Sequence, residues 1–108
     1  MTDPEQQPTI MVARLLVKYG KLAQFSEAMA RLVPIMEDQG WRLQVSYQTI
    51  IGNLHEVYDI WELPDPNAVG PSLIAAATDG RFPEIGEALA ASVETETLSI
   101  VTRSPFSP

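Results

Sequence analysis

The sequence predicts an α+β fold in which strands and helices alternate around one antiparallel sheet. The first observation behind this prediction is a hairpin pattern at the centre, WRLQVSYQTIIGNLHEVYDIWEL over residues 41–63, whose arms alternate and are rich in Val, Ile, Tyr, Trp and Thr. The second is a helical pattern on each side of this hairpin, with one more strand pattern near each end of the chain. We therefore expect the hairpin to form the centre of the sheet.

The hairpin is predicted to turn at Gly52-Asn53, because this dipeptide tolerates the positive φ of a two-residue turn. This register pairs Ser46 with Asp59 and Gln48 with Val57. One face then carries mostly polar side chains: Gln44, Ser46, Gln48, Ile50, His55, Val57, Asp59 and Trp61. The other face carries Leu43, Val45, Tyr47, Ile51, Tyr58 and Ile60, and we expect helices to cover it. A three-residue loop would mix the two sets.

Size and composition bound the class of protein. The chain has 108 residues, enough for one domain with a hydrophobic core, and 45% of them are hydrophobic against 19% charged. A net charge of −7 repels phosphate groups, so we expect neither a nucleic acid nor an anionic membrane as partner. The absence of cysteine excludes disulfides, a thiolate nucleophile and a zinc knuckle.

Both ends of the chain are expected to lie outside the domain. Residues 1–9, MTDPEQQPT, carry acid where a secretory signal would carry base, and we expect a disordered tail and a cytoplasmic protein. The domain is predicted to span residues 10–103. Residues 104–108 are predicted to form a C-terminal tail.

The first strand is predicted over residues 10–18, where IMVARLLVK is apolar enough for a strand covered on both faces. Arg14 is the single charge in its middle. This arginine either pairs with a carboxylate at the surface or orients an anionic or carbonyl group in a pocket. Both interpretations remain open from the sequence.

The first helix follows the turn at Tyr19-Gly20-Lys21. An apolar stripe at helical spacing predicts it: Leu22, Phe25, Met29, Leu32 and Met36. Pro34 lies inside this pattern and is expected to kink or interrupt the helix, because it cannot donate to the carbonyl of Ala30. Gly40 suits the left-handed position that ends a helix.

The second half of the chain predicts a broken helix and a last strand. Asn67 can cap a short helix, Gly70-Pro71 should disrupt any regular helix there, and SLIAAAT from Ser72 is a better helical segment. A further helix is predicted over residues 83–92, with Pro83 in its first turn. The last strand is predicted over residues 95–103. The order of elements is that of a ferredoxin-like βαββαβ sheet with four antiparallel strands.

Three stretches together resemble the NIPSNAP family of dimeric α+β barrel proteins: VKYGKLAQF, LVPIMEDQG and IGNLHEVYDIWEL. The resemblance spans residues 10–102. It implies a homodimer in which the sheets of two protomers pack face to face, with a cavity on each side. Family members often carry histidine two residues before the Trp of the second hairpin strand, where this chain has Asp59.

The polar face of the hairpin supplies the candidate site. The predicted catalytic residues are Asp59, His55 and Arg14. Trp61, Gln44, Ser46 and Gln48 are predicted to bind the substrate. His55 can shuttle a proton near neutral pH, and a desolvated Asp59 beside Trp61 can act as a general acid or base. Asp59 can equally serve to pair with Arg14.

Other chemistries find no support in the sequence. It holds no nucleophilic triad, no glycine-rich phosphate loop and no clustered metal ligands, so we expect neither a metal nor a cofactor. A haem held by His55 stays open, since relatives in the wider barrel superfamily include haem-degrading enzymes.

Three functions remain in view. The first is a cofactor-independent enzyme that acts on a hydrophobic or aromatic, polyketide-like small molecule by proton transfer, as an isomerase, cyclase or monooxygenase. The second is a small-molecule-binding or accessory dimer without turnover. The third is a structural dimer with a wet interface. The aspartate and the tryptophan in mid-strand favour the first.

Overall fold

The computed structural model describes residues 8–108. Its elements are β1 (Thr9–Val17), α1 (Leu22–Asp38), β2 (Arg42–Gln48), β3 (Glu56–Leu63), a 3-10 turn (Pro66–Ala68), α2 (Val69–Thr78), α3 (Phe82–Ser92) and β4 (Val93–Val101). The strands form one antiparallel sheet in the order β2-β3-β1-β4. The chain therefore has the predicted ferredoxin-like βαββαβ fold. The tail predicted at residues 1–9 falls largely on residues 1–7, which lie outside the described part.

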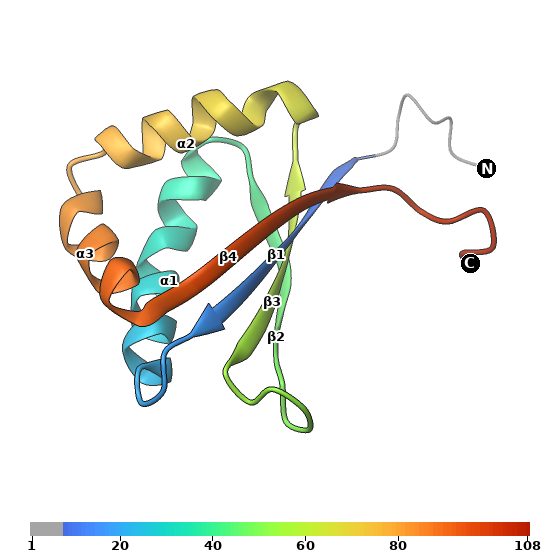
Figure 1. The fold of residues 1–108 in the computed structure, drawn as a ribbon. Coiled ribbons are helices and arrows are strands. Elements are labelled where there is room, and N and C mark those ends of the chain that lie inside the picture. Colours follow the sequence, from blue (N-terminus) through green and yellow to red (C-terminus); the bar gives the residue numbers. More distant parts are fainter. Residues whose placement is uncertain (1–7) are drawn as a thin grey trace.

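The molecule has two layers in the described part of the chain. Figure 1 shows α1, α2 and α3 on one side of the sheet, while no element covers the other side. Strand β1 buries every second side chain against the helices, namely Met11, Ala13, Leu15 and Val17, as the alternation of a strand requires. The hydrophobic core therefore lies between the sheet and the helices, and the second sheet face is open.

The hairpin pairs largely as predicted, but its faces are reversed. Ser46 lies opposite Asp59 and Gln48 opposite Val57, as predicted. The helices, however, cover the face that carries Val57, Asp59 and Trp61, so the expectation that they cover the Val45 and Tyr58 face is wrong. The reason is that Trp61 and Val57 pair with core residues of β1, and this large apolar area outweighs one carboxyl group.

Two local features of the hairpin also differ from the prediction. The register shifts between Leu43 and Val45, so that Leu43 and not Gln44 lies opposite Trp61. The strands are joined by residues 49–55 and not by a two-residue turn. Gly52 does take a positive φ of 121°, and Asn53 closes the loop by accepting the Glu56 N–H at 3.0 Å through its carbonyl.

Helix α1 runs unbroken through Pro34, so the expected interruption is wrong. Pro34 is exposed, and water can therefore satisfy the carbonyl of Ala30 that loses its donor. Gly40 follows the helix with a φ of 85°, which confirms its predicted left-handed position.

The broken helix begins earlier than predicted. Asp65 caps the 3-10 turn by accepting the Asn67 N–H at 2.7 Å, so Asn67 is not the cap. Helix α2 then includes Gly70-Pro71, because a proline in the first turn removes no helical hydrogen bond. Pro83 lies in the first turn of α3, as predicted.

An ion pair fixes the turn between α2 and α3 against α1. Arg81 donates to Asp79 at 2.8 and 2.9 Å and to Asp38 at 2.7 Å. The hydrogen bonds from Arg81 lower the pKa of Asp79 to about 2.

Among the described helices, none is both long and apolar enough to span a bilayer.

Candidate functional site

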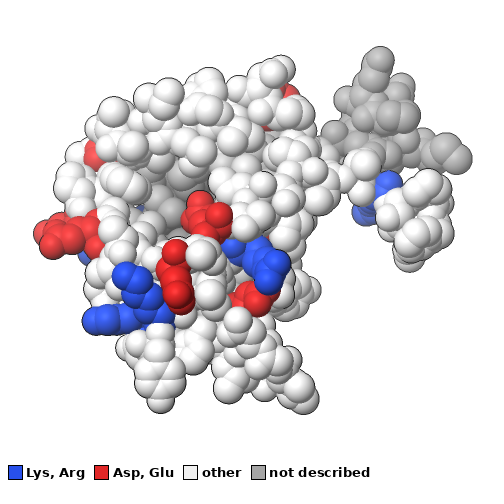
Figure 2. All heavy atoms as spheres, in the orientation of Figure 1, with Lys and Arg blue, Asp and Glu red and all other residues white. Residues whose placement is uncertain are grey.

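A cavity of about 450 Å³ lies between the sheet and the helices. In Figure 2 a hollow opens between α2, α3 and β4, with acidic side chains at its edge. Apolar side chains from β1, the three helices and β4 make up most of its wall: Met11, Ala13, Leu15, Met29, Leu32, Met36, Leu73, Leu89, Val93 and Leu98. Its size is that of a site for a small organic molecule.

Asp59 is the buried carboxyl group of this cavity. Strand β3 places it on the helix-facing side between Val57 and Trp61, and it is 2% exposed. Its Oδ1 accepts a hydrogen bond of 2.6 Å from the Ser46 hydroxyl, while its Oδ2 has no partner among the described residues. Burial raises the pKa of Asp59, and the Ser46 hydrogen bond opposes this shift only in part.

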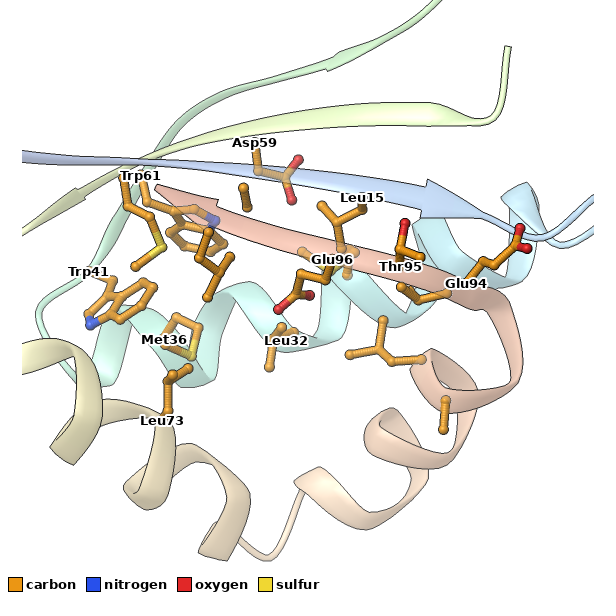
Figure 3. Close-up of a pocket in the computed structure, with 17 residues that line it drawn as sticks. Leu15, Leu32, Met36, Trp41, Asp59, Trp61, Leu73, Glu94, Thr95 and Glu96 are labelled. Atoms are coloured by element: carbon orange, nitrogen blue, oxygen red, sulfur yellow. The ribbon is translucent and has the colours of Figure 1, made fainter. Parts of the chain in front are cut away.

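Glu96 brings a second carboxyl group to the same cavity. It lies on β4 opposite Leu15 of β1, and β1 separates it from the strand β3 that carries Asp59. Figure 3 shows its side chain directed into the hollow. Desolvation raises the pKa of Glu96, and the nearby charge of Asp59 raises it further. Glu96 was not among the predicted site residues. One sequence signal could have found it: Glu96, Leu98 and Ile100 are spaced two apart, which places an acidic side chain on an otherwise apolar face of the strand.

Two tryptophans form the aromatic end of the cavity. Trp41 and Trp61 meet edge to face, with ring centroids 5.7 Å apart and an interplanar angle of 73°. Both are 4% exposed. Trp61 was predicted here, whereas Trp41 was missed because it precedes the strand that carries the polar residues.

A second cavity of about 300 Å³ lies on the other side of Asp59, between α1 and the strands β2 and β3. Ser46, Gln48 and Asp59 line it, together with α1 residues that include Met29. Asp59 and Met29 line both cavities. The carboxyl group therefore stands in the wall between two hollows.

Arg14 does not join this site. It lies on the open face of the sheet, where its Nε donates to Glu56, and the Tyr58 hydroxyl donates to the same carboxylate. Tyr58 and then Arg14 lower the pKa of Glu56 through these hydrogen bonds. The predicted alternative of an Arg14 pair with Asp59 is wrong, because strand alternation sends the two side chains to opposite faces.

His55 and Gln44 also lie away from both cavities. His55 belongs to the connection between β2 and β3, and its ring is 5.3 Å from that of Tyr19. Gln44 donates to Glu62 at 3.0 Å. A haem bound in either cavity would therefore find no histidine, since neither lining contains one. The described residues also hold no cluster of three acidic, histidine or cysteine side chains suited to a metal.

The fold and the cavity together define a ferredoxin-like α+β domain with a hydrophobic pocket between sheet and helices. A comparison with family models identifies the family: the NIPSNAP model matches residues 11–108. The chain belongs to the NIPSNAP family, as the resemblance indicated. No curated protein matched the sequence.

Solved structures show the same fold at low sequence identity. A NIPSNAP family protein of unknown function from Agrobacterium tumefaciens has a TM-score of 0.82 at 15% identity, over 100% of this chain and 98% of its own. Another from the same organism scores 0.77 at 20% identity, over 94% and 98%. SnoaB, a cofactor-independent oxygenase from Streptomyces nogalater, scores 0.67 at 18% identity, over 93% and 98%. These likenesses establish the fold.

Proposed function

We propose that this protein is a cofactor-independent enzyme that moves a proton on a hydrophobic, polyketide-like aromatic molecule held in the cavity beside Asp59. The observation that carries the proposal is Asp59 itself. A residue that is 2% exposed and whose carboxyl group has one oxygen without a partner among the described residues costs stability, and sites that retain such a group are commonly functional. The likeness to SnoaB, described as a cofactor-independent oxygenase, supports the same class.

The chemistry follows from the position of Asp59. Its Oδ2 can take a proton from a carbon that adjoins a carbonyl group, while Ser46 holds the other oxygen in place. The raised pKa makes the ionised carboxylate a stronger base than one in water. Return of the proton at another carbon gives an isomer. Attack of the resulting enolate on a second carbonyl gives a ring, and its reaction with O₂ gives an oxygenated product.

Proton exchange at carbon tests this proposal directly. We expect the protein to speed the incorporation of deuterium from D₂O into anthrone, a tricyclic ketone with acidic C–H bonds, as measured by NMR. In Asp59→Asn the catalysed rate should fall by about 10² to 10⁴-fold, the usual contribution of a general acid or base.

Glu27→Gln is the matched control, since it removes one exposed carboxylate from α1 without touching either cavity. It should retain the wild-type exchange rate. Equal rates in wild type and Asp59→Asn would refute Asp59 as the base. No catalysed exchange with anthrone or related polycyclic ketones would favour the non-catalytic alternative, a binding or accessory protein that uses the same cavity.

The open sheet face supports the homodimer that the family resemblance implies. It presents a largely apolar surface to solvent: Val12, Val45, Tyr47, Tyr58, Ile60 and Val101. A sheet face of this composition is typical of an interface. We propose that a second copy of the chain packs on it.

Sedimentation velocity tests the dimer. The wild-type protein should sediment as a species of twice the 11.9 kDa chain mass. Ile60→Arg, at the centre of the open face, should weaken the dimer at least about tenfold, because it buries an unpaired charge in an apolar contact. Circular dichroism confirms that the variant is folded. A monomeric wild type, or a folded variant with undiminished association, would exclude this face as the interface.

A further inference from the structure

The charges around the main cavity are all of one sign. Among the residues that the structure describes, three carboxyl groups line it, from Asp59, Glu94 and Glu96, and no lysine, arginine or histidine does. Figure 3 shows Asp59 and Glu96 approaching the hollow from different strands, and Glu94 and Thr95 near its rim. A ligand that enters therefore passes acidic groups and meets no cation among the residues of the wall.

The buried oxygen of Asp59 sets a second, independent requirement on the ligand, which concerns hydrogen bonding. Asp59 lines the cavity, and its Oδ2 has no hydrogen-bond partner among the described residues, whereas its Oδ1 already accepts from Ser46. A ligand that donates a hydrogen bond to this oxygen would remove the cost of an unsatisfied buried acceptor. A ligand carboxylate can donate none, and it would bring a second negative charge into an apolar space.

The two tryptophans define the remaining part of the ligand. Trp41 and Trp61 present an aromatic surface at one end of the cavity, and Leu32, Met36 and Leu73 complete this end with apolar side chains. Flat aromatic rings pack well on such a surface. An ammonium group would gain further from the aromatic faces and the acidic rim.

We propose that this cavity selects its ligand by charge: it binds an aromatic molecule with a neutral or positively charged hydrogen-bond donor and rejects a carboxylate of the same shape. The proposal rests on the proposed function only in placing the ligand in this cavity, and it names the substrate class. Like charges at a binding site act chiefly as a device against wrong ligands. The substrate of the enzyme is thus an uncharged or cationic aromatic compound.

Equilibrium dialysis with three matched probes tests the proposal. The probes are 2-naphthylmethanol, 2-naphthylmethylamine and 2-naphthoate at neutral pH, which share one ring system and differ in the charge of a small substituent. The naphthoate should bind the wild-type protein at least about tenfold more weakly than each of the other two. Discrimination below tenfold, or no binding of any probe, overturns the proposal.

Two charge-matched variants show where the discrimination arises. Glu96→Gln removes a carboxylate from the cavity, and Glu87→Gln removes one from the exposed surface of α3 outside it. The first should reduce the discrimination against naphthoate at least about threefold, and the second should leave it unchanged. Equal effects would assign the discrimination to the net charge of −7 and overturn the proposal.

The same experiments separate this inference from the enzyme proposal. Charge discrimination in the absence of catalysed deuterium exchange would leave the selective cavity standing and reject the enzyme. Catalysed exchange together with tight naphthoate binding would keep the enzyme and reject the selectivity.

Discussion

Asp59→Asn is expected to make the folded protein more stable at neutral pH while it removes the proposed base. The asparagine has the same shape, and it carries no charge into a site that is 2% exposed. Relief of one buried, incompletely hydrogen-bonded carboxylate should raise the free energy of unfolding by about 1 to 3 kcal/mol. Thermal unfolding followed by circular dichroism measures the change. A gain in stability with a loss of function is the common signature of an active-site residue.

The pH dependence of this gain has a defined sign. Burial raises the pKa of Asp59 in the folded state above its ordinary value of 3.8, so the folded protein holds the proton where the unfolded chain has released it. Stability of the wild type therefore falls as pH rises from 3.8 through the folded pKa. The advantage of Asp59→Asn should vanish below pH 3.8 and be fully present above the folded pKa. An advantage that is independent of pH would show that the charge of Asp59 is not its source.

Ile35→Ala is expected to produce a large loss of stability. Ile35 lies in α1 with 0% of its surface exposed, inside the cluster that joins the helices to the sheet. Removing three carbon atoms leaves a void in a densely packed region, at a cost of about 2 to 5 kcal/mol. This is a large part of the roughly 5 to 15 kcal/mol that stabilises a small domain. Urea denaturation at fixed protein concentration measures it.

Ile74→Ala is the matched control. The same atoms are removed from α2 at a position that is 69% exposed, and the free energy of unfolding should change by less than about 0.5 kcal/mol. Similar losses in the two variants would indicate that Ile74 is covered in solution, for instance by another molecule. A small loss for Ile35→Ala would contradict the described core.

The order of elements could be predicted because each element carries its own local signal. The stripe of α1, the left-handed Gly40 and the proline in the first turn of α3 are properties of short segments. The choice of covered sheet face could not be predicted in the same way. It depends on which side chains of β1 align with those of β3 on one face, and the nearly continuous apolar run of β1 shows no preference for either face.

The candidate site could also be predicted only where a local sequence pattern marks a residue. Asp59 could be singled out because strands are depleted in Asp wherever they lie, and Trp61 because it lies two residues further along the same strand face. Arg14 was assigned to the same site because the phase of β1 relative to β3 is set by tertiary pairing alone. Glu96 and Trp41 reach the cavity from segments distant in sequence. They lie near Asp59 because of the strand order, which no local sequence pattern reveals.

The position of Asp59 between two hollows determines how this residue can be studied. Its side chain, with that of Met29, belongs to the wall of both cavities. Truncation to alanine would remove part of this wall and join the main cavity to the second cavity beside α1. The ligand would then bind in a larger cavity that water could enter from the second side. A loss of activity could come either from the missing carboxyl group or from the opened cavity wall. The isosteric asparagine keeps the partition intact, and it isolates the role of the carboxyl group from that of the wall.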